Sequence, residues 1–252
     1  MMIFTIAARE LRSLFLSPLA WSILAVVQLI LAYLFLSQLD GYMEVQSQLL
    51  GMAGAPGVTE IVVAPIFGNA TIILLLVVPL LTMRLVSEER RAQTLALLFS
   101  APLSMSEIVI GKFLGVMGFL LIMVAMLALM PLSLLLGGSL DLGLLASALL
   151  GLVLLLACFA AVGLFMSTLT DQPTVAAIST FGVLLMLWII DWAGSNEAGH
   201  ISGLFAYLSI LRHFEPMLRG VFDSSDVIYY LLFVTVFIGL SIRRLDADRL
   251  QH

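Results

Sequence analysis

Long apolar runs separated by short polar segments dominate this sequence. A helix that crosses a membrane needs about 20 mostly apolar residues. Six runs approach or exceed this length: Leu19 to Leu39, Ile66 to Leu85, Ile108 to Leu136, Leu140 to Leu169, Val175 to Ile190 and Val227 to Ile242. We therefore predict an all-α integral membrane protein in which residues 1–252 form one transmembrane domain with six membrane-spanning helices.

Residues 1–17 follow a different pattern, that of an amphipathic helix. At about 100° per residue, the apolar side chains gather on one face: Ile3, Phe4, Ala7, Leu11, Leu14 and Phe15. The opposite face carries Arg9, Arg12 and Ser13. A helix of this kind lies along the membrane surface, and Pro18 marks its end. We expect either a simple interfacial anchor or an elbow that also braces a partner.

The segments between the runs differ in length and composition. Residues 40–65 are acidic, contain no Lys or Arg and include the Gly/Pro-rich stretch "GMAGAPG", so we predict a loop with at most one short helix. We expect this segment and residues 191–226 to be extracytoplasmic. Residues 191–226 are long enough to form short helices, and "STLTDQP", residues 167–173, predicts a tight turn.

The composition agrees with this pattern. Hydrophobic residues make up 62% of the chain and charged residues 11%, against roughly 25% charged residues in soluble domains. The mean hydropathy is +1.17. The runs take up most of the sequence and leave no room for a soluble catalytic domain.

The basic residues are unevenly distributed. With six spans, both termini lie on one side of the membrane, and that side holds nine of the 11 Lys and Arg residues: Arg9, Arg12, Arg84, Arg90, Arg91, Lys112, Arg243, Arg244 and Arg249. The other side holds only Arg212 and Arg219. Because loops rich in Lys and Arg stay in the cytoplasm, we predict cytoplasmic termini.

Several catalytic patterns are missing. There is no HExxH motif and no histidine in a predicted span, and Gly111-Lys112 lacks the first glycine of a P-loop. We expect no catalytic residue, no metal site and no cofactor bound by this chain, so any ATP must be bound by another chain. We predict that His200 and His213 are surface residues and that Cys158 is a small packing residue.

A few residues within the spans call for a specific role. Gln28 and Asn69 are expected either to form hydrogen bonds between helices or to line a substrate path. Gly111 and Gly115 have the spacing that lets two helices approach closely.

The densest charge cluster, Ser87-Glu-Glu-Arg-Arg91, lies between the second and third spans. The apolar stretch Ala92 to Phe99 follows it outside the bilayer, and Ser104 to Glu107 fits a capping box that restarts a helix. Residues 87–107 either fold back on the protein's own spans or form a docking element. We favour docking with a soluble partner, because exposed apolar patches mark interaction sites.

The stretch "VPLLTMRLVSEERRAQTLALLFSAPLSMSEIVIGKFLG", Val78 to Gly115, resembles the permease subunits of ABC-2 type transporters. The shared features are the "EE+" cluster, "T-x-x-L-L" and "E-I-V-x-G-K". That family often has a glycine before the Thr, where this chain has Gln93. Val175 to Trp192 looks like the fifth span of the gliding-motility-associated branch, which is close to the permeases of nitrous oxide reductase maturation.

The resemblance implies an ABC-2, type V exporter-like fold in the bacterial inner membrane, with residues that contact a cytoplasmic ABC ATPase: Glu88, Glu89, Arg90, Arg91, Thr94 and Asp171. That separate ATPase would bind ATP and Mg²⁺. A second permease copy, identical or different, completes the pair. Membrane lipid surrounds it, an extracytoplasmic auxiliary protein is a further candidate partner, and no nucleic acid is implied. The alternative is a non-transport membrane scaffold that anchors an extracytoplasmic assembly or maturation complex.

Overall fold

The computed structural model describes residues 2–49, 57–94, 104–136, 140–194 and 209–249, and within these ranges it consists of helices and turns without strands. Six helices are long and apolar enough to cross a membrane, which confirms the predicted spans. They are α2 (Pro18–Leu49), α3 (Ala64–Thr82), α6 (Met105–Ser133), α7 (Leu142–Leu169), α8 (Pro173–Gly194) and α11 (Ser224–Arg249).

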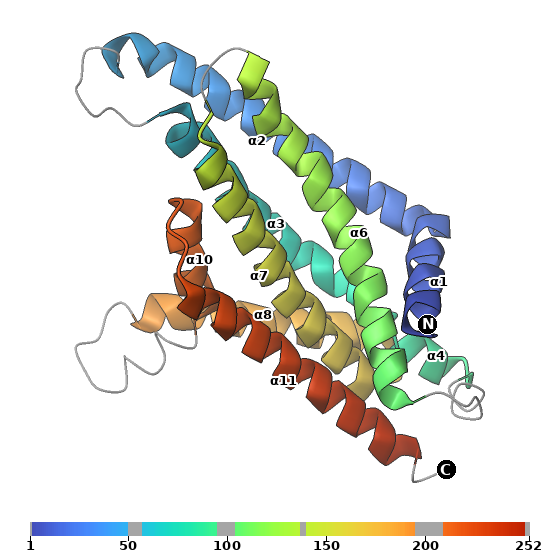
Figure 1. Cartoon of the computed structure of the whole chain (residues 1–252). Coiled ribbons are helices and arrows are strands. Elements are labelled where there is room, and N and C mark those ends of the chain that lie inside the picture. The colour runs from blue at the N-terminus through green and yellow to red at the C-terminus, as the bar shows by residue number, and fades with distance from the viewer. Residues whose placement is uncertain (1, 50–56, 95–103, 137–139, 195–208, 250–252) are drawn as a thin grey trace.

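Shorter elements complete the fold (Figure 1). They are α1 (Met2–Leu16), the π-helix η1 (Thr59–Val63), α4 (Ser87–Arg91), the 3₁₀ turn η2 (Leu134–Leu136) and α10 (Ile210–Leu218).

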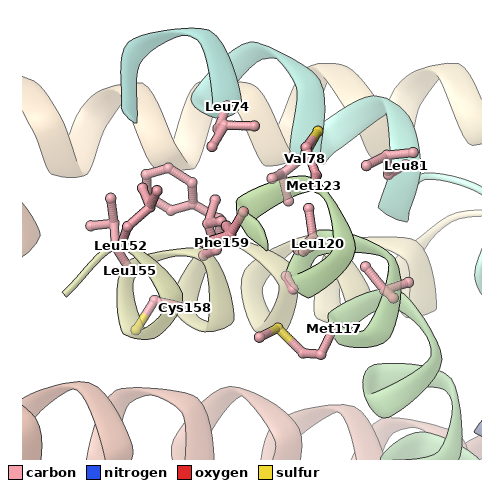
Figure 2. Packing of buried hydrophobic residues seen from close by; sticks show 14 of the residues in the cluster. Leu74, Val78, Leu81, Met117, Leu120, Met123, Leu152, Leu155, Cys158 and Phe159 are labelled. Carbon is pink, nitrogen blue, oxygen red and sulfur yellow. The ribbon is translucent and has the colours of Figure 1, made fainter. Parts of the chain in front are cut away.

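Helix α7 lies at the centre of the bundle, in contact with α3, α6, α8, α10 and α11. Its sequence is apolar on all sides, as expected of a helix surrounded by others. Figure 2 shows Leu155 and Phe159 of α7 among the apolar side chains of α3 and α6. Cys158 is fully buried, with its Sγ 3.7 Å from the carbonyl oxygen of Tyr230 on α11. It occupies the packing position that the sequence predicts.

Helix α1 packs against the first half of α6, and the two glycines of α6 make this possible. A Cβ on Gly111 would lie 2.7 Å from the Ile6 Cβ, and one on Gly115 would lie 2.6 Å from the Glu10 Cβ. The glycine spacing therefore does serve close packing, and the partner is α1. Phe4, which belongs to the predicted apolar face of α1, is 74% exposed on the protein and is therefore available to a membrane surface. The side of α1 that packs on α6 includes Ile6 and Glu10.

Helix α2 extends further than its apolar run. It continues to Leu49, so the first part of the predicted loop 40–65 is helical, and α3 begins directly after η1 at Ala64. The apolar run marks only the part of the helix that is suited to the membrane interior. The Glu, Gln, Met and Leu residues after position 42 have high helix propensities and favour continuation of the helix beyond that part. Residues 50–56 lie outside the described ranges.

The short helix α10 confirms the expectation of helical structure within 191–226. It packs on α7, where a Cβ on Gly151 would meet the side chains of Phe214 and Met217 at about 3 Å. His213 is buried rather than on the surface: its Nδ1 lies 2.9 Å from the Ser209 carbonyl oxygen, and its ring stacks on Tyr229 with centroids 4.0 Å apart. The aromatic ring that covers His213 belongs to α11, and the spacing of residues along the sequence does not reveal this contact. His200 lies outside the described residues.

Candidate functional site at the charged end of the bundle

One end of the bundle carries most of the basic residues. It comprises α1, the turn 83–86, α4, the first turns of α6, the 170–172 turn between α7 and α8, and the last turns of α11; we call it the charged end. Figure 1 shows both chain termini and α4 at this end. Arg212 and Arg219 belong to the α10 region, at the opposite end. The grouping expected from the sequence is thus present in three dimensions.

Helix α4 is separated from α3 by the turn 83–86, and Ser167 at the end of α7 holds this turn. The Ser167 Oγ accepts hydrogen bonds from the N–H groups of Val86 and Ser87, both at 3.0 Å, and donates to the Met83 carbonyl at 3.1 Å. Ser167 and Ser87 are fully buried. One hydroxyl therefore satisfies the backbone donors that the helix break leaves unpaired.

Glu89 points inward from α4 to the sole lysine of the sequence. The Lys112 Nζ lies 2.8 Å from the Glu89 Oε1 and 3.5 Å from the Glu10 Oε2 on α1. The Lys112 side chain is only 4% exposed, whereas Arg9, whose Nη2 lies 3.7 Å from Glu89, is 71% exposed. We call Glu10, Glu89 and Lys112 the Lys112 cluster. It links α1, α4 and α6 through charges that are largely shielded from water.

Arg90 points inward in a second direction, towards α7 and α11. Its Nη2 donates to the Thr168 carbonyl at 2.9 Å and pairs with Asp248, which also lies 3.5 Å from the Arg244 Nη2. The Arg90 Nε lies 3.3 Å from the Asp171 Oδ1. The structure therefore brings together the two segments that the resemblance marks as partner contacts, α4 and the 170–172 turn.

Glu88 and Arg91 point away from these clusters, and both are exposed. They line a depression of about 470 Å³ at the charged end, together with Met83, Arg84, Ala92, Pro173 and Thr174. Among the described residues, Glu88 and Arg91 take part in no ion pair. Of the charged residues on α4, these two are available to an external partner.

The end of α4 has a well-defined cap. The Thr94 N–H donates to the Glu89 carbonyl at 3.0 Å and the Gln93 N–H donates to the Arg90 carbonyl at 3.1 Å, the two hydrogen bonds of a Schellman motif. Gln93 has φ 59°, in the left-handed region that favours glycine. This is the position where the resembled family often has glycine. Thr94 is exposed, and residues 95–103 lie outside the described ranges.

The start of α6 confirms the predicted capping box. The Glu107 N–H donates to the Ser104 Oγ at 3.2 Å, and the Ser104 N–H donates to the Glu107 Oε2 at 3.1 Å. Lys112 therefore projects from a helix whose beginning is fixed by local hydrogen bonds, about two turns further along.

Of the two residues considered for a substrate path, Gln28 makes an interhelical hydrogen bond: its Nε2 donates to the Met123 carbonyl at 3.0 Å. Asn69 is half-buried on α3. Next to it in sequence, Gly68 lines a cavity of about 540 Å³ at the opposite end of the bundle. The other lining residues are Glu60, Ala64, Pro65, Glu215, Leu218 and Arg219.

Sequence reasoning missed several residues that shape the charged end, chiefly Glu10, Asp248 and Ser167, and it did not predict a partner for Lys112 within the protein. A useful signal was present, since a lysine within an apolar helix needs a partner. In the described part of the chain, no three His, Cys, Asp or Glu residues are grouped so as to hold a metal ion.

Comparison with known proteins identifies the family of this chain. No curated protein matches the sequence. Residues 4–250, nearly the whole chain, match the family described as ABC-2 family transporter protein. With six apolar helices and a match of this length, the chain belongs to the ABC-2 transporter family, as the membrane-embedded permease component of an ABC transporter.

Proposed function

We propose that this permease couples ATP hydrolysis by a separate cytoplasmic ATPase subunit to export, or to mechanical work, across the bacterial inner membrane. The observation that carries this proposal is the division of charges on α4. Glu89 and Arg90 tie α4 to the transmembrane helices, while Glu88 and Arg91 line an open depression. Helix α4 is thus attached to the bundle on one side and exposed on the other. This arrangement suits an element that transmits force from the ATPase to the membrane-spanning helices.

The distribution of basic residues supports a cytoplasmic location for the charged end. Nine of the 11 Lys and Arg residues belong to this end, in segments next to the spans, where the bias towards the cytoplasm operates. A soluble ATPase in the cytoplasm would then reach α4 and the 170–172 turn directly. The sequence has no P-loop motif, so in this proposal ATP and Mg²⁺ belong to the partner.

The working unit in this proposal is a pair of permeases with two copies of the ATPase. The outer faces of α2, α8 and α11 expose large apolar side chains, including Leu29, Tyr33, Ile178, Met186 and Leu232. Such faces suit lipid or a second permease. Closure of the ATPase pair on ATP would displace α4 in each copy and tilt the attached helices. The gliding-motility-associated branch stays a prediction that sequence resemblance alone supports.

The test is gentle solubilisation of the protein from native membranes, followed by mass spectrometry and an ATP hydrolysis assay of the purified complex. We expect a soluble subunit carrying a P-loop, present at the same stoichiometry as the permease and active in ATP hydrolysis. An intact permease that purifies without any such subunit would contradict the proposal and favour the scaffold alternative.

A further inference from the structure

We propose that Lys112 is the positioning residue that links the ATPase-docking helix α4 to α1, so that a displacement of α4 also moves the corner between α1 and α2. This inference rests on the proposed function and extends it. It assigns a path inside the permease, which begins at the docking helix and ends at a membrane-spanning helix on the periphery of the bundle.

The first step of this path is the pair between Glu89 and Lys112. Helix α4 packs against α7 and α8, and it reaches α1 and α6 through the ion pairs of Glu89. Lys112 is the better partner of Glu89, because its Nζ lies 2.8 Å away and is nearly inaccessible to water, whereas Arg9 is 3.7 Å away and exposed. Buried charges are screened far less than exposed ones. The second oxygen of Glu89 is buried and accepts no hydrogen bond from the described residues.

The second step connects Lys112 to α1. The Glu10 Oε2 lies 3.5 Å from the Lys112 Nζ, and the Glu10 side chain is 16% exposed. Gly115, less than one turn after Lys112, brings the backbone of α6 against Glu10, since a Cβ there would lie 2.6 Å from the Glu10 Cβ. Two anions on different helices thus share one cation. If α4 moves and Lys112 does not follow, Glu89 loses its nearest and best-shielded cation and keeps only the exposed Arg9, which is unfavourable for a largely shielded carboxylate.

The third step carries the movement from α1 to α2. The chain turns at Ser17, whose N–H donates to the Leu14 carbonyl at 3.0 Å. The Trp21 Nε1 on α2 donates to the Phe15 carbonyl on α1 at 2.7 Å, and the rings of Phe15 and Trp21 pack with centroids 5.6 Å apart. These contacts fix the angle of the corner. A displacement of α1 therefore reaches α2 directly.

The sequence offers a direct probe of this path, because Lys112 is the sole lysine. The chain labelled with ¹⁵N and ¹³C lysine gives one side-chain ammonium signal in nanodiscs, without the need for assignment. We expect a solvent-protected signal that shifts when Glu10→Gln or Glu89→Gln is introduced separately. A signal that responds to neither substitution, or that matches a freely exposed lysine, overturns the cluster.

The coupling role is tested with three variants in the complex with the co-purified ATPase. Lys112→Gln is expected to bind the ATPase at the wild-type stoichiometry but to lower ATP turnover per complex by roughly tenfold, within the range typical of coupling between sites. Lys112→Arg, which keeps the charge, should restore most of the turnover. Arg12→Gln, at an exposed position on α1, serves as the control and should leave turnover unchanged.

Glu10→Gln provides a milder variant if Lys112→Gln fails to fold, because it leaves Lys112 balanced by Glu89 and removes only the ion pair between Lys112 and α1. We expect normal ATPase binding and reduced turnover. Full turnover in Glu10→Gln or in Lys112→Gln overturns the inference while the proposed function stands. A folded wild-type permease that binds no ATPase overturns the proposed function, and the coupling role with it, even where the lysine signal shifts as expected.

Discussion

Gly163 on α7 lies directly against Thr82 on α3. A Cβ added to Gly163 would lie 2.7 Å from the Thr82 Cβ and even closer to its Oγ1, and both residues are inside the bundle. The two helices thus approach as closely as a glycine permits. This contact lies just before the turn that leads to α4, so it helps to position that turn against α7.

Replacement of Gly163 by alanine should separate α3 from α7. We expect a destabilisation of about 1–3 kcal/mol, the usual cost of overpacking a filled core, measured as a lower Tm in detergent. Gly182→Ala is the matched control, because no atom lies within 4 Å of a Cβ at that position. The contact argument fails if the two variants have the same Tm.

Ser167→Ala should loosen the turn before α4. The substitution leaves the N–H groups of Val86 and Ser87 without their acceptor, at about 1–3 kcal/mol for each buried unsatisfied group. Hydrogen–deuterium exchange should accelerate at these two amides. Ser179→Ala is the control, since the Ser179 Oγ donates only to carbonyls of its own helix. Unchanged exchange at Val86 and Ser87 would show that another group holds the turn.

Gly115→Ala should displace α1 from α6, because the new methyl group would collide with the Glu10 side chain. We expect faster hydrogen–deuterium exchange over α1 and a lower Tm. Gly118→Ala adds the same methyl group where its nearest neighbour, the Leu11 Cδ2, would be 3.4 Å away. That control should behave like the wild type; equal exchange over α1 in both variants would contradict the packing described here.

Gln93→Gly should stabilise the end of α4. A left-handed residue other than glycine costs roughly 1–2 kcal/mol, and Gln93 adopts φ 59° at the cap position of the Schellman motif. Slower exchange of the Gln93 and Thr94 amides would report the gain. Gln93→Val should act in the opposite direction, because a β-branched side chain tolerates this conformation poorly. Faster exchange in Gln93→Gly than in the wild type would refute this account of the cap.

The sequence predicted those features that depend on local pattern. Apolar length defined the six spans, and the spacing of Ser104 and Glu107 defined the start of α6. The spacing of Gly111 and Gly115 predicted a close helix contact without identifying α1 as the partner. Local pattern also could not show which side of α1 packs on α6, since that side depends on the glycines of a helix about 100 positions away in the chain.

The roles of the charges on α4 could not be predicted from their order. Glu88, Glu89, Arg90 and Arg91 are consecutive, and their sequence gives no reason to divide them. The division arises because Lys112 meets Glu89 and because the ends of α7 and α11 meet Arg90, up to 158 positions away. Tertiary contacts of this kind leave no periodic signal in one sequence.

The central claim is that the outward face of α4 docks the ATPase, and the most direct test is the affinity of the co-purified ATPase for the permease in nanodiscs. The test variant combines Glu88→Arg with Arg91→Glu, and the matched control reverses two exposed charges of α11, Arg243→Glu with Asp246→Arg. We predict that the Kd rises by about 30-fold or more in the test variant, as expected when an interfacial charge pair loses at least 2 kcal/mol, and stays at the wild-type value in the control. An unchanged Kd and unchanged ATP turnover in the test variant would contradict docking at α4.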